Sequence, residues 1–164
     1  AKILKKDPEN YEARAEIMWC GSLSHNGLTG CGTCGGDWAT HLMEHELGGM
    51  FDVAHGAGLE AVWGSWARYV MDEKPERFAQ FAVDVMGVEE SDDVKSTALK
   101  GIEAVEEFYR MIEMPTNMKE LGINPTDEQI KDMAMKATNH DTQQLGAFKK
   151  LSAKDLVEIY KTAK

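Results

Sequence analysis

Residues 36–59 read GDWATHLMEHELGGMFDVAHGAGL, and this stretch predicts two helices joined by a reversal of the chain. Asp37 stands where an N-cap would precede a helix over residues 38–47. The pair Gly48-Gly49 is expected to end that helix and to supply the backbone freedom for the reversal. The second helix is expected from about residue 56 to residue 69 or 70. Its apolar residues repeat at a spacing of three and four and form one face: Leu59, Val62, Trp63 and Trp66.

The rest of the chain also predicts helices, because Ala, Glu, Lys, Leu and Met are frequent and alternating β-branched and aromatic runs are absent. Asp7 is expected to cap a first helix that runs to about Leu28. The residues of that helix expected to face inward are Ile17, Met18, Cys20 and Leu23. Further helix starts are expected at Lys74-Pro75, Ser91-Asp92-Asp93, Asn124-Pro125-Thr126-Asp127 and Ser152. Because we find no repeat or linker, we predict one all-α helical bundle domain over residues 1–164.

The charge balance excludes several partners. The chain has 18 Lys and Arg residues against 28 Asp and Glu residues, a formal net charge of −10. Phosphate backbones and anionic membrane surfaces repel such a chain, so we expect no nucleic-acid or membrane partner. No stretch is apolar enough to span a bilayer, and residues 1–10 lack the order of a signal peptide. We therefore expect a cytoplasmic location.

The three cysteines do not form a disulfide framework, which fits a reducing compartment. Cys31 and Cys34 form one C-x-x-C pair in a glycine-rich loop. A zinc ribbon needs a second C-x-x-C, and a redox site needs the pair to open a helix after a strand. Neither context is present in the sequence, so two free thiols are the simpler interpretation, and the role of the pair stays open.

The main functional signal is a cluster of histidines at positions 41, 45 and 55. A metal ion accepts imidazole nitrogens at about 2 Å, so its ligands must start from neighbouring backbone positions. His41 and His45 are one helical turn apart. An unbroken helix would separate His41 from His55 by about 21 Å, so we expect the reversal to bring His55 beside His41. Each histidine also has a structural interpretation, as a surface or core residue bonded to its neighbours.

The sequence excludes the zinc-peptidase motif. His45-Glu46 begins the H-E-x-x-H pattern of zinc peptidases, but Gly49 stands where the second histidine is required.

Three segments together resemble the metal-binding region of the iron-containing alcohol dehydrogenases, in their butanol dehydrogenase-like branch. They are residues 36–41, His45-Glu46-Leu47, and Asp52-x-x-His55-Gly56-x-Gly58-Leu59. The similarity extends more loosely from residues 10–14 to Asp155-x-x-x-Ile159-Tyr160, which implies that family's C-terminal helical domain. The resemblance implies interconversion of alcohols and aldehydes with NADH or NADPH. It also implies a divalent iron held by one aspartate and three histidines, of which His41 and His55 are two. His45 matches a nearby active-site histidine that is usually not a ligand.

The chain also departs from the family pattern. The remaining aspartate and histidine of the family lie upstream in a D-x-x-x-H helix, and the nucleotide domain lies further upstream. Neither occurs in these 164 residues, so we expect an inactive fragment whose parent binds NADH or NADPH mainly through the absent N-terminal domain. Asp37-x-x-x-His41 has the same spacing, but we interpret Asp37 as a helix cap and not as a ligand. The resemblance further implies a homodimer for the full-length enzyme.

The metal is expected to be Fe²⁺, although Zn²⁺ or another divalent ion suits the same donors. With two of its histidines present, the fragment is expected to retain little iron, and Glu44 or Asp52 could serve as substitute carboxylate ligands. In the parent enzyme the metal would act as a Lewis acid, and His45 would relay a proton. Trp38, Phe51 and Trp63 either form the wall of the alcohol pocket or belong to the core.

Two alternatives stay open on the sequence. The first is an HD-type metal phosphohydrolase that uses His140-Asp141 as its dyad. The second is a non-catalytic helical interaction module, because these residues include no glycine-rich phosphate motif after a strand.

Overall fold

The computed structural model describes residues 1–33 and 35–164, and the regular elements of these residues are all helical. The prediction of an all-α fold is therefore confirmed. Cys34 lies outside the described residues, so the structure leaves the C-x-x-C pair undescribed, while Cys31 is exposed. The helices are α1 Lys2–Lys6, α2 Tyr11–His25, α3 Ala39–Phe51, α4 His55–Val70, α5 Pro75–Asp84, α6 Val94–Met111, α7 Asp127–Ala137 and α8 Ala153–Ala163, with 3-10 turns η1 Leu28–Gly30 and η2 Met71–Glu73.

The described residues fall into two compact units, residues 1–36 and residues 37–164. The expectation of one domain over residues 1–164 stays a prediction, and each unit is described by itself.

The first unit corrects the prediction for the N-terminal helix. Asp7 is the C-cap of α1, and Asn10 caps α2 by accepting a hydrogen bond from the Ala13 N–H. The short helix α1 precedes the predicted start, and Asp7 closes it. The prediction that Ile17, Met18 and Cys20 face a core is also wrong, because all three are exposed and α2 buries no residue. A unit this small cannot enclose a core of its own.

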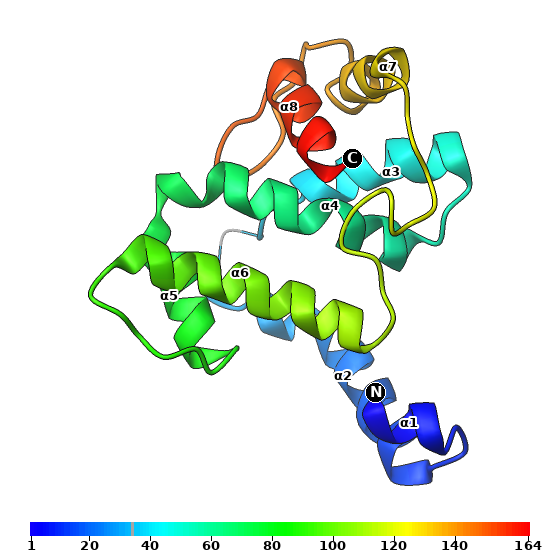
Figure 1. Cartoon of the computed structure of the whole chain (residues 1–164), viewed down its shortest axis with the longest axis vertical. Helices are drawn as coiled ribbons and strands as arrows, with labels where there is room; N and C mark the ends of the chain where they lie inside the picture. The colour runs from blue at the N-terminus through cyan, green and yellow to red at the C-terminus, as the bar shows by residue number, and fades with distance from the viewer. Residues whose placement is uncertain (34) are drawn as a thin grey trace. The chain divides into compact units, whose positions relative to one another are not determined.

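The second unit contains the hydrophobic core. Helix α4 contacts α3, α6 and α8, and Figure 1 shows it between the α5–α6 pair and α8. The expected caps of the later helices are present. Pro75 opens α5, and Thr126 and Ser152 form capping boxes at the starts of α7 and α8. The largest fully buried core side chains are Met43, Leu47, Ile102, Met118, Ile130, Met133, Leu151, Leu156, Ile159 and Tyr160.

The reversal between α3 and α4 does not occur at the glycine pair. Gly48 and Gly49 lie inside α3, which continues to Phe51. A glycine in a helix interior costs about 1 kcal/mol, and the burial of Met43 and Leu47 on the same helix offsets that cost. Asp52 makes the turn instead, in the left-handed conformation (φ 54°), and its N–H donates to the Gly48 carbonyl at 2.8 Å. Helix α4 then begins at His55.

A hydrogen bond between α4 and α8 predicts how stability depends on pH. The Tyr69 hydroxyl donates to Asp155 at 2.5 Å. This bond, with burial and the carboxylate charge, raises the pKa of Tyr69 to about 12. Burial opposes ionisation of Asp155, but hydrogen bonds from Ser152 and Tyr69 outweigh it and lower its pKa below the usual value.

We therefore expect the free energy of unfolding to fall on both sides of neutrality. The contribution of Asp155 is complete above about pH 4 and is lost as the pH falls through its lowered folded-state pKa. The contribution of Tyr69 is complete below about pH 10 and is lost as the pH rises towards 12. Urea unfolding at a series of pH values measures both limbs. Tyr69→Phe is expected to flatten the alkaline limb, and an unchanged alkaline limb in that variant would contradict the assignment.

Candidate metal centre

The three predicted histidines converge at the junction of α3 and α4. Helix α3 carries His41 and His45, one turn apart, and His55 is the first residue of α4. The ring centroid of His55 lies 5.4 Å from that of His41 and 5.5 Å from that of His45. The His41 and His45 centroids are 6.5 Å apart. The expected approach of His55 to His41 is confirmed, although Asp52 and not the glycine pair makes the turn.

Two of the three separations, those from His55 to His41 and from His55 to His45, suit imidazoles that share one ion. With a metal–nitrogen distance of about 2.1 Å, each ring centre lies about 3 Å from the ion, so two ligand rings are about 5–6 Å apart. Three imidazoles are a donor set that Fe²⁺ and Zn²⁺ both accept. The residues present therefore fit a divalent metal, and the choice of ion is left open by the chemistry of the donors.

A buried carboxylate completes the cluster. Glu44 lies between His41 and His45 on α3, its side chain is 2% exposed, and Glu44 Oε2 contacts His55 Nδ1. One ligand atom from each of Glu44, His45 and His55 lies within 4.8 Å of the other two. The sequence suggests Glu44 only as a substitute ligand and does not reveal its burial. The sequence feature related to this burial is the presence of glycine at positions 48 and 58, where the absence of a side chain leaves room for Glu44.

The histidines differ in exposure. His41 is half-buried, and the Trp38 ring packs edge-on against it at 4.8 Å between centroids. His45 and His55 are exposed. One side of the cluster is therefore open to solvent and can receive a substrate or further ligands.

A hydrogen bond to the Met43 carbonyl anchors the buried face of helix α3. Inside the core, the Tyr160 hydroxyl donates to the Met43 carbonyl at 2.7 Å. Burial, helped by the charges of Glu46 and Glu44, raises the pKa of Tyr160 above its usual value, so the hydroxyl keeps its proton. This bond fixes the position of α3 relative to α8.

Asp37 holds the start of α3. Its Oδ1 accepts a hydrogen bond from the Ala39 N–H at 2.8 Å, and its Oδ2 accepts from the N–H groups of Ala147 and Phe148, both at 2.8 Å. The residue stands one position before the N-cap, Trp38. These bonds confirm that the Asp37 side chain caps the start of α3.

The aromatic residues considered for a substrate pocket do not lie together. Trp38 contacts His41, and Phe51 is half-buried against the core. Trp63 lines a separate hollow of about 290 Å³ whose other walls are Arg77, Phe78, Phe81 and Phe148.

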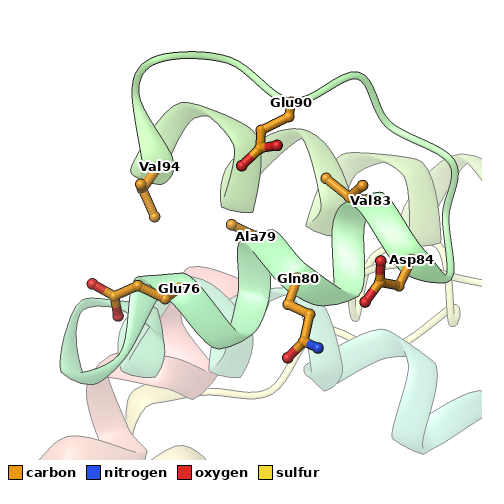
Figure 2. A pocket seen from close by; sticks show the side chains of 7 residues that line it. All are labelled: Glu76, Ala79, Gln80, Val83, Asp84, Glu90 and Val94. Carbon is orange, nitrogen blue, oxygen red and sulfur yellow. The ribbon is translucent and has the colours of Figure 1, made fainter.

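A further hollow, of about 300 Å³, is acidic. Its lining includes Glu76 and Asp84 from α5 and Glu90 from the segment before α6. Figure 2 shows the three carboxylates spread around this pocket, so they do not converge on one point as metal ligands would. The lining residues include no histidine, and the pocket is no candidate for the predicted centre.

His140-Asp141, the dyad of the phosphohydrolase alternative, is exposed, and Asp141 Oδ1 accepts a hydrogen bond from the Ala153 N–H. It does not join the cluster of Glu44, His45 and His55. Among residues 1–33 and 35–164, no helix combines the length and the apolar character needed to cross a membrane.

Comparison with known proteins places the whole chain in one family. Residues 1–164 match the family described as "Fe-containing alcohol dehydrogenase family, C-terminal". NADH-dependent butanol dehydrogenase A of Clostridium acetobutylicum is 31% identical over 98% of this chain, and NADPH-dependent aldehyde reductase YqhD of Escherichia coli is 32% identical over 97%. The match spans 41% of the first relative and 40% of the second.

The fold agrees with solved structures of the same family. The crystal structure of NADH-dependent butanol dehydrogenase A from Thermotoga maritima superposes with a TM-score of 0.88 at 33% identity, over 99% of this chain and 42% of that chain. This chain belongs to the iron-containing alcohol dehydrogenase family and corresponds to the C-terminal helical region of its members.

Proposed function

We propose that this chain is the metal-binding part of an NADH- or NADPH-dependent dehydrogenase that interconverts small primary alcohols and aldehydes. The convergence of three imidazoles where α3 meets α4 carries the proposal. The names of the relatives supply the substrate class, since they include a butanol dehydrogenase and an aldehyde reductase.

In this proposal His41 and His55 hold the ion, and Fe²⁺ is the ion that the family name favours. The ion, when bound, supplies a Lewis acid at the substrate oxygen. His41 suits a resident ligand because it is half-buried and Trp38 restricts its ring. His55 suits the same role because it faces His41 from the other helix.

His45 is proposed to move a proton between the substrate oxygen and solvent. It lies one helical turn from His41, it is exposed, and an imidazole is the side chain best suited to take up and release a proton near neutral pH. A group that transfers this proton needs contact with both the metal centre and water. His45 meets both requirements, because it is exposed and lies on the same face of α3 as His41.

The nicotinamide is proposed to bind mainly outside these 164 residues, because the matched relatives are more than twice as long as this chain. We further propose that the complete enzyme is a homodimer in the cytoplasm. A reducing compartment fits the free thiols of Cys20 and Cys31.

The test uses the enzyme encoded by the longest reading frame that contains this chain. We expect it to reduce butanal with NADH or NADPH and to contain one divalent ion per subunit. His45→Ala is expected to retain the metal while kcat falls by about 100-fold, the low end of the usual contribution of general acid–base catalysis. His140→Ala is the control and is expected to change neither quantity. Unchanged turnover in His45→Ala would contradict the proton-transfer role, and absence of nicotinamide-linked activity in the unaltered enzyme would contradict the function.

A further inference from the structure

Glu44 is a buried carboxylate that faces an exposed metal-ligand candidate. The side chain is 2% exposed, whereas His55 is 51% exposed. Burying a carboxylate without a partner is strongly unfavourable, and the contact between Glu44 Oε2 and His55 Nδ1 gives this carboxylate a partner. A carboxylate that accepts a hydrogen bond from one imidazole nitrogen fixes the ring's orientation and leaves the other nitrogen available to a metal.

Two glycines form the space that holds this carboxylate. A Cβ atom at Gly48 would lie 2.9 Å from Glu44 Oε1, and a Cβ atom at Gly58 would lie 2.8 Å from both Oε1 and Cγ. Both contacts are closer than real Cβ atoms allow. Gly49 and Gly56, next to this space on the same two helices, have nothing within 4 Å of their Cβ positions. The close approach is therefore specific to the two glycines that enclose Glu44.

We propose that Glu44 is the positioning residue of the centre and not a ligand. Its Oε1 is enclosed by Gly48 and Gly58, and its Oε2 accepts the Nδ1 proton of His55. The His55 ring is thus held with Nε2 as its free acceptor nitrogen. The part of this inference that concerns the metal rests on the proposed function, because there His55 is a ligand. The part that concerns the orientation of the His55 ring does not depend on the proposed function.

The first readout is the tautomer of His55 in the metal-free chain, measured by ¹⁵N NMR at a pH where ordinary imidazoles are neutral. We expect the Nδ1–H form in the unaltered chain. Glu44→Ala is expected to shift His55 towards the Nε2–H form that free imidazoles prefer. Glu44→Gln keeps an oxygen acceptor of the same size and is expected to retain the Nδ1–H form. A role confined to packing would leave the tautomer unchanged.

The second readout is the affinity of the chain for Zn²⁺ by calorimetric titration at fixed pH. Loss of a residue that orients a ligand typically costs 10–100-fold in metal affinity, and this is the loss expected for Glu44→Ala. Glu44→Gln is expected to stay within a few-fold of the unaltered chain.

Gly58→Ala tests the same proposal with the carboxylate still present. The added methyl group displaces Glu44, so both the tautomer shift and the loss of affinity are expected. Gly56→Ala is the matched control, because its Cβ meets nothing. Circular dichroism establishes that each variant is folded. If the alanine variants are not folded, the tautomer of His55 in the unaltered chain decides the matter, because an Nε2–H form there would overturn the proposal.

The outcomes distinguish the positioning role of Glu44 from the metal-binding role of the centre. Retention of the Nδ1–H form in Glu44→Ala would overturn the positioning role. An affinity that falls as far in Glu44→Gln as in Glu44→Ala would make the carboxylate itself a ligand and would also overturn it. A tautomer shift in Glu44→Ala, with no divalent ion bound by the enzyme encoded by the longest reading frame, would support the positioning role and overturn the metal role of the centre.

Discussion

Replacing His55 with alanine is expected to lower the Zn²⁺ affinity of the chain by more than about 100-fold, the upper end of what losing an outer-shell partner costs. Within the cluster, His55 is the one imidazole that comes from α4, whereas His41 and His45 both come from α3. Its removal also leaves the buried Glu44 without the partner at its Oε2. Calorimetric titration with Zn²⁺ at neutral pH measures the affinity directly.

The order of the Zn²⁺ affinities of His55→Ala, His41→Ala and His45→Ala tests which histidines are ligands and which one moves a proton. His41→Ala is expected to lose more affinity than His45→Ala, because the proposal makes His41 a ligand and His45 a proton carrier. The reverse order would transfer the ligand role to His45, which the separations between rings allow equally well. His140→Ala is the control, since His140 lies outside the cluster and is exposed.

The helix starts that depend on local chemistry were predictable from the sequence. Thr126 and Ser152 each have a polar partner three residues later, and the capping boxes form within four residues without help from the rest of the fold. The start of α2 was not predictable in the same way. Both Asp7 and Asn10 are good caps, and the choice between them depends on α1, whose five residues carry little sequence signal.

The candidate site was predictable in its residues but not in its construction. Helical spacing alone places His41 and His45 on one face, and the need for a reversal brings His55 to them. The position of the reversal depends on the free energy of the whole α3 helix. Burial of Met43 and Leu47 keeps Gly48 and Gly49 helical. A rule that predicts a turn from the glycine pair alone does not include this burial. The role of Glu44 depends on a space formed by two helices, and no single segment reveals it.

Helices α5 and α6 pack so closely that one added methyl group between them is expected to destabilise the fold. Gly101 on α6 is buried, and a Cβ atom there would lie 2.4 Å from the Ala82 Cβ and 2.9 Å from the Ala82 Cα. One of these atoms belongs to the backbone of α5, so a side-chain rotation cannot relieve the overlap. Gly101→Ala is expected to lower the free energy of unfolding by about 1–3 kcal/mol, the usual cost of overpacking.

Gly49→Ala is the matched control for this experiment. It makes the same substitution inside a helix of the same unit, but its Cβ meets nothing within 4 Å. It is expected to raise the free energy of unfolding by about 0.5–1 kcal/mol, because alanine favours the helix more than glycine does. Urea unfolding followed by circular dichroism compares the two variants. Equal stability of Gly101→Ala and the unaltered chain would contradict the close packing of α5 on α6. A folded Gly101→Ala is expected to keep its Zn²⁺ affinity, because α6 contributes no residue to the cluster and the added methyl group meets α5 rather than α3 or the first turn of α4.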